Sequence, residues 1–188
     1  MISPCDLTGA PEIFEGRANR ITTERLVIAP LKRQEAELYL IEPVEFAKAL
    51  RLAEVPQEPD DETRAAYNWL IDLSLKFDAE SGVWTSIWAI ALRQARILVG
   101  TLVFKGPPIA GEAELGYLIS LPFRRKGYMT ESVRAIVRWG RTRSDLKGLV
   151  AETLNDNLPS QKVLINAGFQ RSQDANPEDD ACFWRLNF

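Results

Sequence analysis

The segment from residue 113 to residue 143 most constrains the fold of this chain, because a β-like run passes through a short basic turn into an amphipathic helix. The run Ala113 to Ser120 ends just before Pro122, and the helical pattern begins at Tyr128. A helix that opens directly after a strand and loop presents unpaired N–H groups and a partial positive charge at one point. The segment therefore predicts an anion site, most naturally for phosphates.

The turn itself supports this interpretation. It contains three consecutive cations and then a glycine, which would let a ligand approach the backbone without meeting a Cβ: Arg124, Arg125, Lys126 and Gly127. The alternative is a solvated loop that only caps a helix, since basic turns are common on protein surfaces.

Length and composition predict one globular domain. The chain has 188 residues, and we expect an N-terminal extension over residues 1–20 and a single domain over residues 21–188. A net charge of −3 with interspersed signs argues against nucleic acid as the main partner. The longest apolar run, Ile97 to Phe104, is too short to span a membrane, and the first twenty residues do not resemble a signal peptide. Two isolated cysteines suit a reducing compartment, so a cytoplasmic location is expected.

The chain contains no histidine, which limits its chemistry. Catalysis by Ser-His-Asp or Cys-His groups is excluded, and nearly all zinc sites are excluded too, so no metal is expected. Acid–base steps would have to use carboxylates, Tyr, Cys, Lys or water.

The pattern of apolar residues and turn formers predicts a mixed α+β domain with one central sheet. We expect strands near residues 23–31, 84–92, 96–105, 113–120, 148–154 and 182–188, and helices near 32–41, 43–52, 61–77, 128–143 and 159–167. Large aromatic residues in these patterns, Trp69, Trp84, Trp88 and Trp184, are expected mostly in the core.

Three separated motifs carry a family resemblance. The stretch Ala113-Glu114-Leu115-Gly116-Tyr117, followed by Arg124 to Glu131, resembles the acyl-CoA-binding motif of the GNAT superfamily of N-acyltransferases. The opening Thr23-Glu24-Arg25-Leu26 and the pair Asn157 to Ser160 and Ala167 to Phe169 resemble the branch that acetylates N-termini of ribosomal proteins. The resemblance implies a mostly antiparallel sheet flanked by helices and splayed at the acyl-CoA site.

It also implies which residues bind the cofactor, acetyl-CoA, which would act as co-substrate. Backbone N–H groups around Arg125, Gly127, Met129 and Thr130 would hold the pyrophosphate, together with the neighbouring positions Arg124, Lys126 and Tyr128. Met129 departs from the usual Gly or Ala but leaves the backbone donor intact. Backbone groups of Leu118, Ile119 and Ser120 would bind the pantetheine arm, whose amides can add to a sheet edge as a strand does. On the following helix, Arg134, Arg138 and Arg141 repeat at helical spacing and could meet a 3′-phosphate, although an exposed cationic face is the simpler interpretation of the last two.

Glu114 is the candidate general base. A carboxylate in a central strand, buried beside the cofactor, would have a raised pKa suited to deprotonating an ammonium group. The alternative, of nearly equal weight, is a rim carboxylate in a salt bridge.

The leaving thiolate needs a hydrogen bond or a proton donor. Many relatives use a Tyr after the last helix, but this chain has Tyr only at positions 39, 67, 117 and 128. Ser160 is the expected substitute, with Asn157 bonding the pantetheine; alternatively these two residues only cap a helix. Cys182 is a weaker candidate and is more simply a buried strand residue.

These expectations combine into an N-acetyltransferase that acts on a primary amine. The acceptor, a protein N-terminus or a small-molecule amine, would bind between the helices over residues 32–52 and the loops around Pro107 and 174–180. The rival function is a non-catalytic acyl-CoA-binding or sensing module on the same fold. A homodimer is possible, but no sequence signature indicates one.

Overall fold

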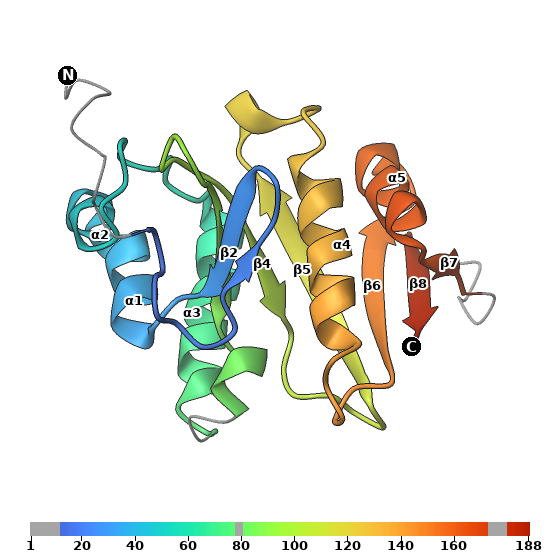
Figure 1. Ribbon diagram of the computed structural model, residues 1–188. Helices are drawn as coiled ribbons and strands as arrows, with labels where there is room; N and C mark the ends of the chain where they lie inside the picture. Colours follow the sequence, from blue (N-terminus) through green and yellow to red (C-terminus); the bar gives the residue numbers. More distant parts are fainter. Residues whose placement is uncertain (1–11, 78–80, 173–179) are drawn as a thin grey trace.

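One twisted sheet passes through the molecule and is covered by helices on both faces (Figure 1). The computed structural model describes residues 12–77, 81–172 and 180–188. Its strands are β1 (Ile21–Thr22), β2 (Leu26–Pro30), β3 (Ile87–Leu92), β4 (Leu98–Phe104), β5 (Glu112–Ile119), β6 (Gly148–Leu154), β7 (Gln170–Arg171) and β8 (Ala181–Asn187). Its α-helices are α1 (Arg33–Ile41), α2 (Pro43–Ala49), α3 (Asp61–Ser74), α4 (Tyr128–Gly140) and α5 (Leu158–Ala167).

The sheet is mostly antiparallel, in the order β1-β2-β3-β4-β5-β6-β8-β7. Among the described strands, the pair β5 and β6 alone is parallel. Its register covers only three positions and ends at Glu114 opposite Val150. Beyond that point β5 continues to Ile119 and β6 continues to Leu154 without pairing to each other. The sheet is therefore split between these two strands, as the resemblance predicted.

The alternation of the strands divides the core into two layers. In β2, Leu26 and Ile28 face the layer under α4 and α5, whereas Val27 and Ala29 face α1 to α3. Because both faces of the central strands are buried, β3 and β4 read as nearly continuous apolar runs.

An aromatic group anchors α4 to the sheet. Five ring pairs among Trp84, Trp88, Phe104 and Trp139 have centroids between 4.9 and 6.0 Å apart, and all five are edge-on or tilted. The core placement predicted for Trp84, Trp88 and Trp184 is confirmed. The prediction for Trp69 is wrong, because its side chain is 53% exposed on α3, where Tyr67 and Leu70 form the buried face instead.

The predicted α+β class and element order are confirmed, with local shifts at the ends. Residues 23–25 form a turn between β1 and β2 rather than the start of a strand. Ser81–Trp84 is a 3-10 turn, so β3 begins later than the pattern indicated. Asp60 is the N-cap of α3, and its side chain accepts a hydrogen bond of 2.8 Å from the Thr63 amide.

Residues 12–20 pack along the first edge of the sheet. Ile13 and Phe14 are buried with residues of α1 and α2, and Arg17 forms an ion pair of 2.5 Å with Glu35. Residues 1–11 of the predicted extension lie outside the described residues. Within the described parts of the chain, no helix is both long and apolar enough to cross a membrane.

Candidate functional site

The split between β5 and β6 opens beside the N-terminus of α4, and this is where the sequence motifs converge (Figure 1). Strand β5 leads through the 3-10 turn Leu121–Phe123 to the basic residues and then to α4. Helix α5 starts next to the end of β6. A ligand lying in the split would thus meet the edge of a strand and the starts of two helices.

The basic turn is built to present backbone N–H groups. Arg125 and Gly127 have positive φ angles of 61° and 79°, a left-handed conformation that is unusual for Arg. Turns with such residues form concave sets of N–H groups that bind anions. The first intrahelical bond runs from the Glu131 amide to the Gly127 carbonyl (3.0 Å), so the amides of residues 128–130 have no acceptor within the helix.

The side chains of the same segment have different environments. Arg124, Arg125 and Lys126 are exposed, as cations for phosphates should be. Met129 is 7% exposed and packs into the core under α4. Met129 is therefore held by its side chain while its amide stays at the helix start, which explains why a large residue is tolerated there.

Fewer backbone groups of β5 face the split than the sequence indicated. The Ser120 amide donates to the Val99 carbonyl in β4 (3.0 Å), and the Lys105 amide donates to the Glu114 carbonyl (3.0 Å). Because backbone groups alternate along a strand, Leu118 also faces β4, and only odd-numbered positions face the split. Of the three residues predicted to bind pantetheine, Ile119 is the one whose backbone points to the split. Its carbonyl accepts a hydrogen bond of 3.1 Å from Arg124 Nε.

Ser160 and Asn157 lie on the opposite side of the split, at the start of α5. Asn157 caps the helix by accepting a hydrogen bond of 3.2 Å from the Ser160 amide, so the capping role is present. The Ser160 carbonyl accepts a hydrogen bond of 3.0 Å from the Tyr117 hydroxyl, which extends from β5. Burial raises the pKa of Tyr117, and the bond to Ser160 acts in the opposite direction, so the phenol stays protonated and donates.

Tyr117 is a residue whose position the sequence analysis did not use. A Tyr was sought after the last helix, but Tyr117 precedes the basic turn and reaches Ser160 through the fold. The alternation of side chains along β5 could have indicated this position, since Tyr117 falls on the same buried face as Ala113 and Leu115.

Glu114 does not have the environment expected of a buried base. Its side chain is 35% exposed and forms an ion pair with Lys105 on the neighbouring strand segment. The structure thus favours the alternative of a rim carboxylate in a salt bridge. Glu114 nevertheless occupies the last paired position of β5, immediately before the split.

Two other candidates are committed to contacts. Cys182 is 1% exposed in β8, and its Sγ lies 2.9 Å from Asn155 Oδ1. Arg134 donates from Nε and Nη2 to the Asn166 carbonyl, at 2.9 and 2.8 Å, near the end of α5. Arg134 thereby joins α4 to α5 rather than extending toward the basic turn.

The sequence comparisons fit this geometry. The family profile described as "Acetyltransferase (GNAT) domain" matches residues 25–170 of the chain. The chain belongs to the GNAT acetyltransferase family. That span contains the basic turn, the split between β5 and β6, and the start of α5, and the predicted family is confirmed.

Relatives of this GNAT domain carry acetyltransferase names. The chain is 34% identical over 83 residues to the uncharacterized N-acetyltransferase YjdG of Bacillus subtilis (strain 168), covering 44% of this chain and 49% of YjdG. The chain thus aligns with about half the length of YjdG. It is 26% identical over 153 residues to the uncharacterized N-acetyltransferase p20 of Bacillus licheniformis, covering 79% of this chain and 81% of p20.

A solved structure shares the fold. RimL, a ribosomal L7/L12 alpha-N-protein acetyltransferase in complex with coenzyme A, superposes with a TM-score of 0.59 and 21% identity. The match covers 89% of this chain and 97% of the RimL chain. At this identity the likeness establishes the GNAT fold.

The opening motif of the GNAT domain lies directly beside the basic turn, which sequence reasoning did not foresee. Thr23 and Arg25, in the turn between β1 and β2, contact Glu131 in the first turn of α4. Sequence separation of more than 100 residues hid this contact, and only the shared presence of the two motifs hinted at it.

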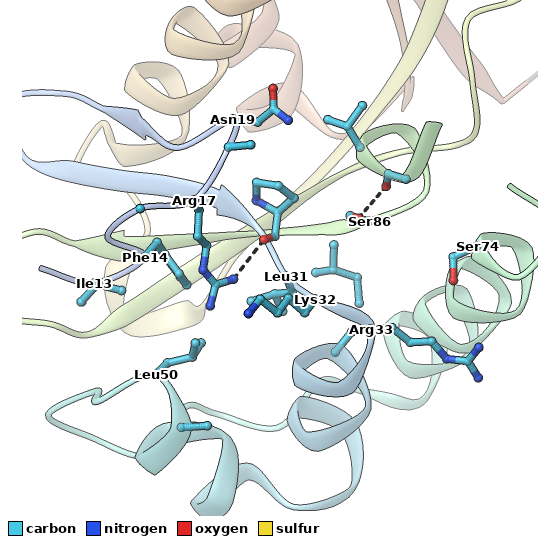
Figure 2. Close-up of a pocket in the computed structure, with 18 of the residues that line it drawn as sticks. Ile13, Phe14, Arg17, Asn19, Leu31, Lys32, Arg33, Leu50, Ser74 and Ser86 are labelled. Carbon is cyan, nitrogen blue, oxygen red and sulfur yellow. Dashed lines mark hydrogen bonds between the residues drawn. The ribbon is translucent and has the colours of Figure 1, made fainter. Parts of the chain in front are cut away.

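The GNAT domain also contains a separate cavity of about 970 Å³, which lies beside residues 12–19, α1 and α2 (Figure 2). Ile13, Phe14, Lys32 and Leu50 are among the residues that line it. No residue of β5, β6, α4 or α5 lines this cavity, so it is distinct from the split. The helices α1 and α2 were expected to build the acceptor pocket, and Arg33, Ala36 and Ala49 from these two helices line this separate cavity. The acidic loop 174–180, the other expected wall, lies almost entirely outside the described residues.

Proposed function

We propose that this protein transfers an acetyl group from acetyl-CoA to a primary amine. The observation that carries the proposal is the end of the β5–β6 ladder at Glu114 and Val150, next to a helix start with unpaired amides. A thioester on a long, flexible amide arm that ends in a diphosphate suits a split strand edge beside an anion site.

In this arrangement the diphosphate of coenzyme A would meet the amides of residues 125–130, with Arg124 and Lys126 supplying charge. The pantetheine arm would add to the free edge of β5 at Ile119 and Tyr117. Asn157 and Ser160 would face the arm from the start of α5. The acetyl group would then lie near the point where the two strands part.

The reaction would proceed by direct attack. Glu114, or a water that it holds, takes a proton from the substrate ammonium group. The free amine nitrogen forms a bond to the thioester carbonyl carbon, the carbon–sulfur bond breaks, and coenzyme A leaves as a thiolate. The nitrogen then gives up its second proton, which the departing thiolate takes, so the products are a neutral amide and the coenzyme A thiol. Ser160 would stabilise that thiolate through its hydroxyl, and no covalent enzyme intermediate forms.

Glu114 acts as a base in this scheme only if its ion pair with Lys105 opens when substrates bind. The carboxylate and its partner are both partly exposed, so the pair is weakly held and such opening costs little. The same ion pair is the observation that favours the second candidate function, a non-catalytic acyl-CoA sensor.

The acceptor class is inferred from a structural neighbour. RimL acts on the N-terminus of a ribosomal protein, and the fold here is the same. We therefore propose that the acceptor is a protein N-terminus or a small-molecule amine, bound near the point where β5 and β6 part. A homodimer would be compatible with this site.

The test is calorimetric titration with acetyl-CoA, followed by thiol release against a panel of amines that includes peptide N-termini. We expect binding and turnover with one amine class. Binding without turnover across the panel would favour the sensor, and absence of binding would overturn the proposal. Glu114→Gln should lower kcat and leave the Kd for coenzyme A nearly unchanged, whereas an unaltered pH–rate profile would remove Glu114 as the base.

A further inference from the structure

The turn between β1 and β2 forms a clamp on the basic turn, and its centre is Arg25. Figure 1 shows the tip of this hairpin next to the start of α4. The two segments are more than 100 residues apart in the sequence, and several side-chain bonds join them.

One end of the clamp is the carboxylate of Glu131. It accepts hydrogen bonds from the Thr23 hydroxyl (2.6 Å), the Arg25 amide (3.1 Å) and Arg25 Nε (2.7 Å), and Arg25 Nη2 lies 2.6 Å from it. Partial burial alone would raise the pKa of Glu131, but the bonds from Thr23 and Arg25 outweigh it and hold that pKa below its usual value. Glu131 is therefore a carboxylate anion that fixes the direction of the Arg25 guanidinium.

The other end of the clamp is the turn itself. Arg25 Nη1 donates to the Lys126 carbonyl (3.0 Å), and its guanidinium carbon lies 4.6 Å from the centre of the Tyr128 ring. Between these residues, a Cβ placed on Gly127 would lie 3.5 Å from Arg25 Nη2. One guanidinium thus contacts Lys126 and Tyr128, the residues on either side of Gly127.

The conformation of the turn gives this contact its importance. Arg125 is left-handed at a φ of 61°, which is unfavourable for a residue with a Cβ and persists only where neighbours enforce it. The side chains of Arg124, Arg125 and Lys126 are exposed, and the contacts of Arg124 with Ile119 and of Lys126 with Phe123 stay within the segment that joins β5 to α4. The bonds from Arg25 supply support from outside the turn.

We propose that Arg25 is a positioning residue for coenzyme A, and that its fork of donors, aimed by Glu131, holds the basic turn in its phosphate-binding conformation. The inference rests on the proposed function, since it assigns the diphosphate to this turn. Arg25 acts through geometry and not through net charge, because Glu131 neutralises it. The opening motif and the phosphate motif then form one functional unit.

The test compares Arg25→Lys and Arg25→Met with the wild type by calorimetric titration of coenzyme A, well below each melting temperature. Lysine keeps the charge but cannot reach Glu131 and the Lys126 carbonyl in a fork, so both variants should raise Kd by about tenfold, the order expected for one charge-assisted hydrogen bond. Arg33→Met is the matched control, because it removes the surface ion pair with Glu37 on α1 and should leave Kd unchanged.

The double variant Arg25→Met with Glu131→Gln separates positioning from general destabilisation. If Arg25 and Glu131 work as one clamp, the double variant should bind coenzyme A about as weakly as Arg25→Met alone. Three results would each overturn the inference. They are wild-type affinity in Arg25→Lys, a double variant that binds coenzyme A clearly more weakly than Arg25→Met alone, and a loss of affinity in Arg33→Met equal to that in the Arg25 variants. Failure of the wild type to bind coenzyme A would instead overturn the proposed function, so the two failures are distinguishable.

Discussion

Two substitutions at Gly127 separate the effect of backbone conformation on coenzyme A binding from the effect of charge. Its φ of 79° is left-handed, so any other L residue is strained there by about 1–2 kcal/mol. A Cβ at this position would meet Arg25 Nη2 at 3.5 Å, which is an ordinary contact and adds no clash. Gly127→Ala and Gly127→Glu should therefore lose similar stability, with melting temperatures lower by about 2–8 °C.

Binding of coenzyme A should distinguish the two variants sharply. Alanine keeps the backbone amide and adds no charge. Glutamate places a negative charge beside the diphosphate, and repulsion between unit charges about 4 Å apart is worth between about 1 kcal/mol in water and about 4 kcal/mol near a protein surface. We expect Gly127→Glu to raise the Kd for coenzyme A by at least about fivefold over Gly127→Ala.

The assay is calorimetric titration of the two folded variants at equal ionic strength, with melting curves as the control. Equal Kd values for the Ala and Glu variants would refute the assignment of the diphosphate to this turn. The gap should also shrink as salt rises, because repulsion between exposed charges is screened. A gap that does not depend on salt would mean that bulk, and not charge, is responsible.

Three further predictions concern the surroundings of the split. Because the pKa of Glu131 lies below its usual value of 4.5, the ionised carboxylate stabilises the fold above that pH, and this stabilisation is lost as the pH falls. In urea titrations from about pH 6 to about pH 3, Glu131→Gln should therefore lose less unfolding free energy than the wild type, and parallel curves of stability against pH would contradict the clamp. Tyr117→Phe removes the hydroxyl that donates to the Ser160 carbonyl, which should cost about 0.5–1.5 kcal/mol of unfolding free energy. In thiol-release assays this variant should lower kcat more than it changes the Kd for coenzyme A, and an unchanged kcat would separate Tyr117 from the site. Gly100→Ala places a Cβ against the Leu118 carbonyl on β5, so overpacking should cost about 1–3 kcal/mol of unfolding free energy and weaken coenzyme A binding. The control Gly82→Ala, whose Cβ meets nothing within 4 Å, should do neither, and equal melting curves for the two variants would show that β5 shifts to accept the added methyl group at no cost.

Much of the architecture could be predicted from local patterns. Strand β6 was predicted with the bounds that the structure has, and α4 and α5 begin within one residue of the predicted positions. These elements have strong periodicity and clear boundary residues, such as Gly127 before α4 and Gly168 after α5. The strand starts that differed most, at β2 and β3, lie where tight turns precede runs that are apolar on both faces, and such runs do not mark where pairing starts.

The site divides in the same way. Backbone features such as the helix start at the basic turn are written in adjacent residues, so the sequence alone determined the anion site as a prediction. Side-chain environments depend on what packs beside them. The exposure of Glu114, its ion pair with Lys105 and the reach of Tyr117 to Ser160 all arise from strand alignment across the sheet.

The sequence by itself determined the class of fold, the order of its elements and the family. Each of these depends on short segments, whose residue types and spacing can be recognised without knowing what packs against them. Only the tertiary structure decided that the opening motif and the phosphate motif meet at Arg25 and Glu131, and that Ile119 alone of three candidates turns its backbone to the split. Contacts between segments 100 residues apart depend on the pairing of β1 with β2 and the docking of α4, and no local propensity encodes that packing.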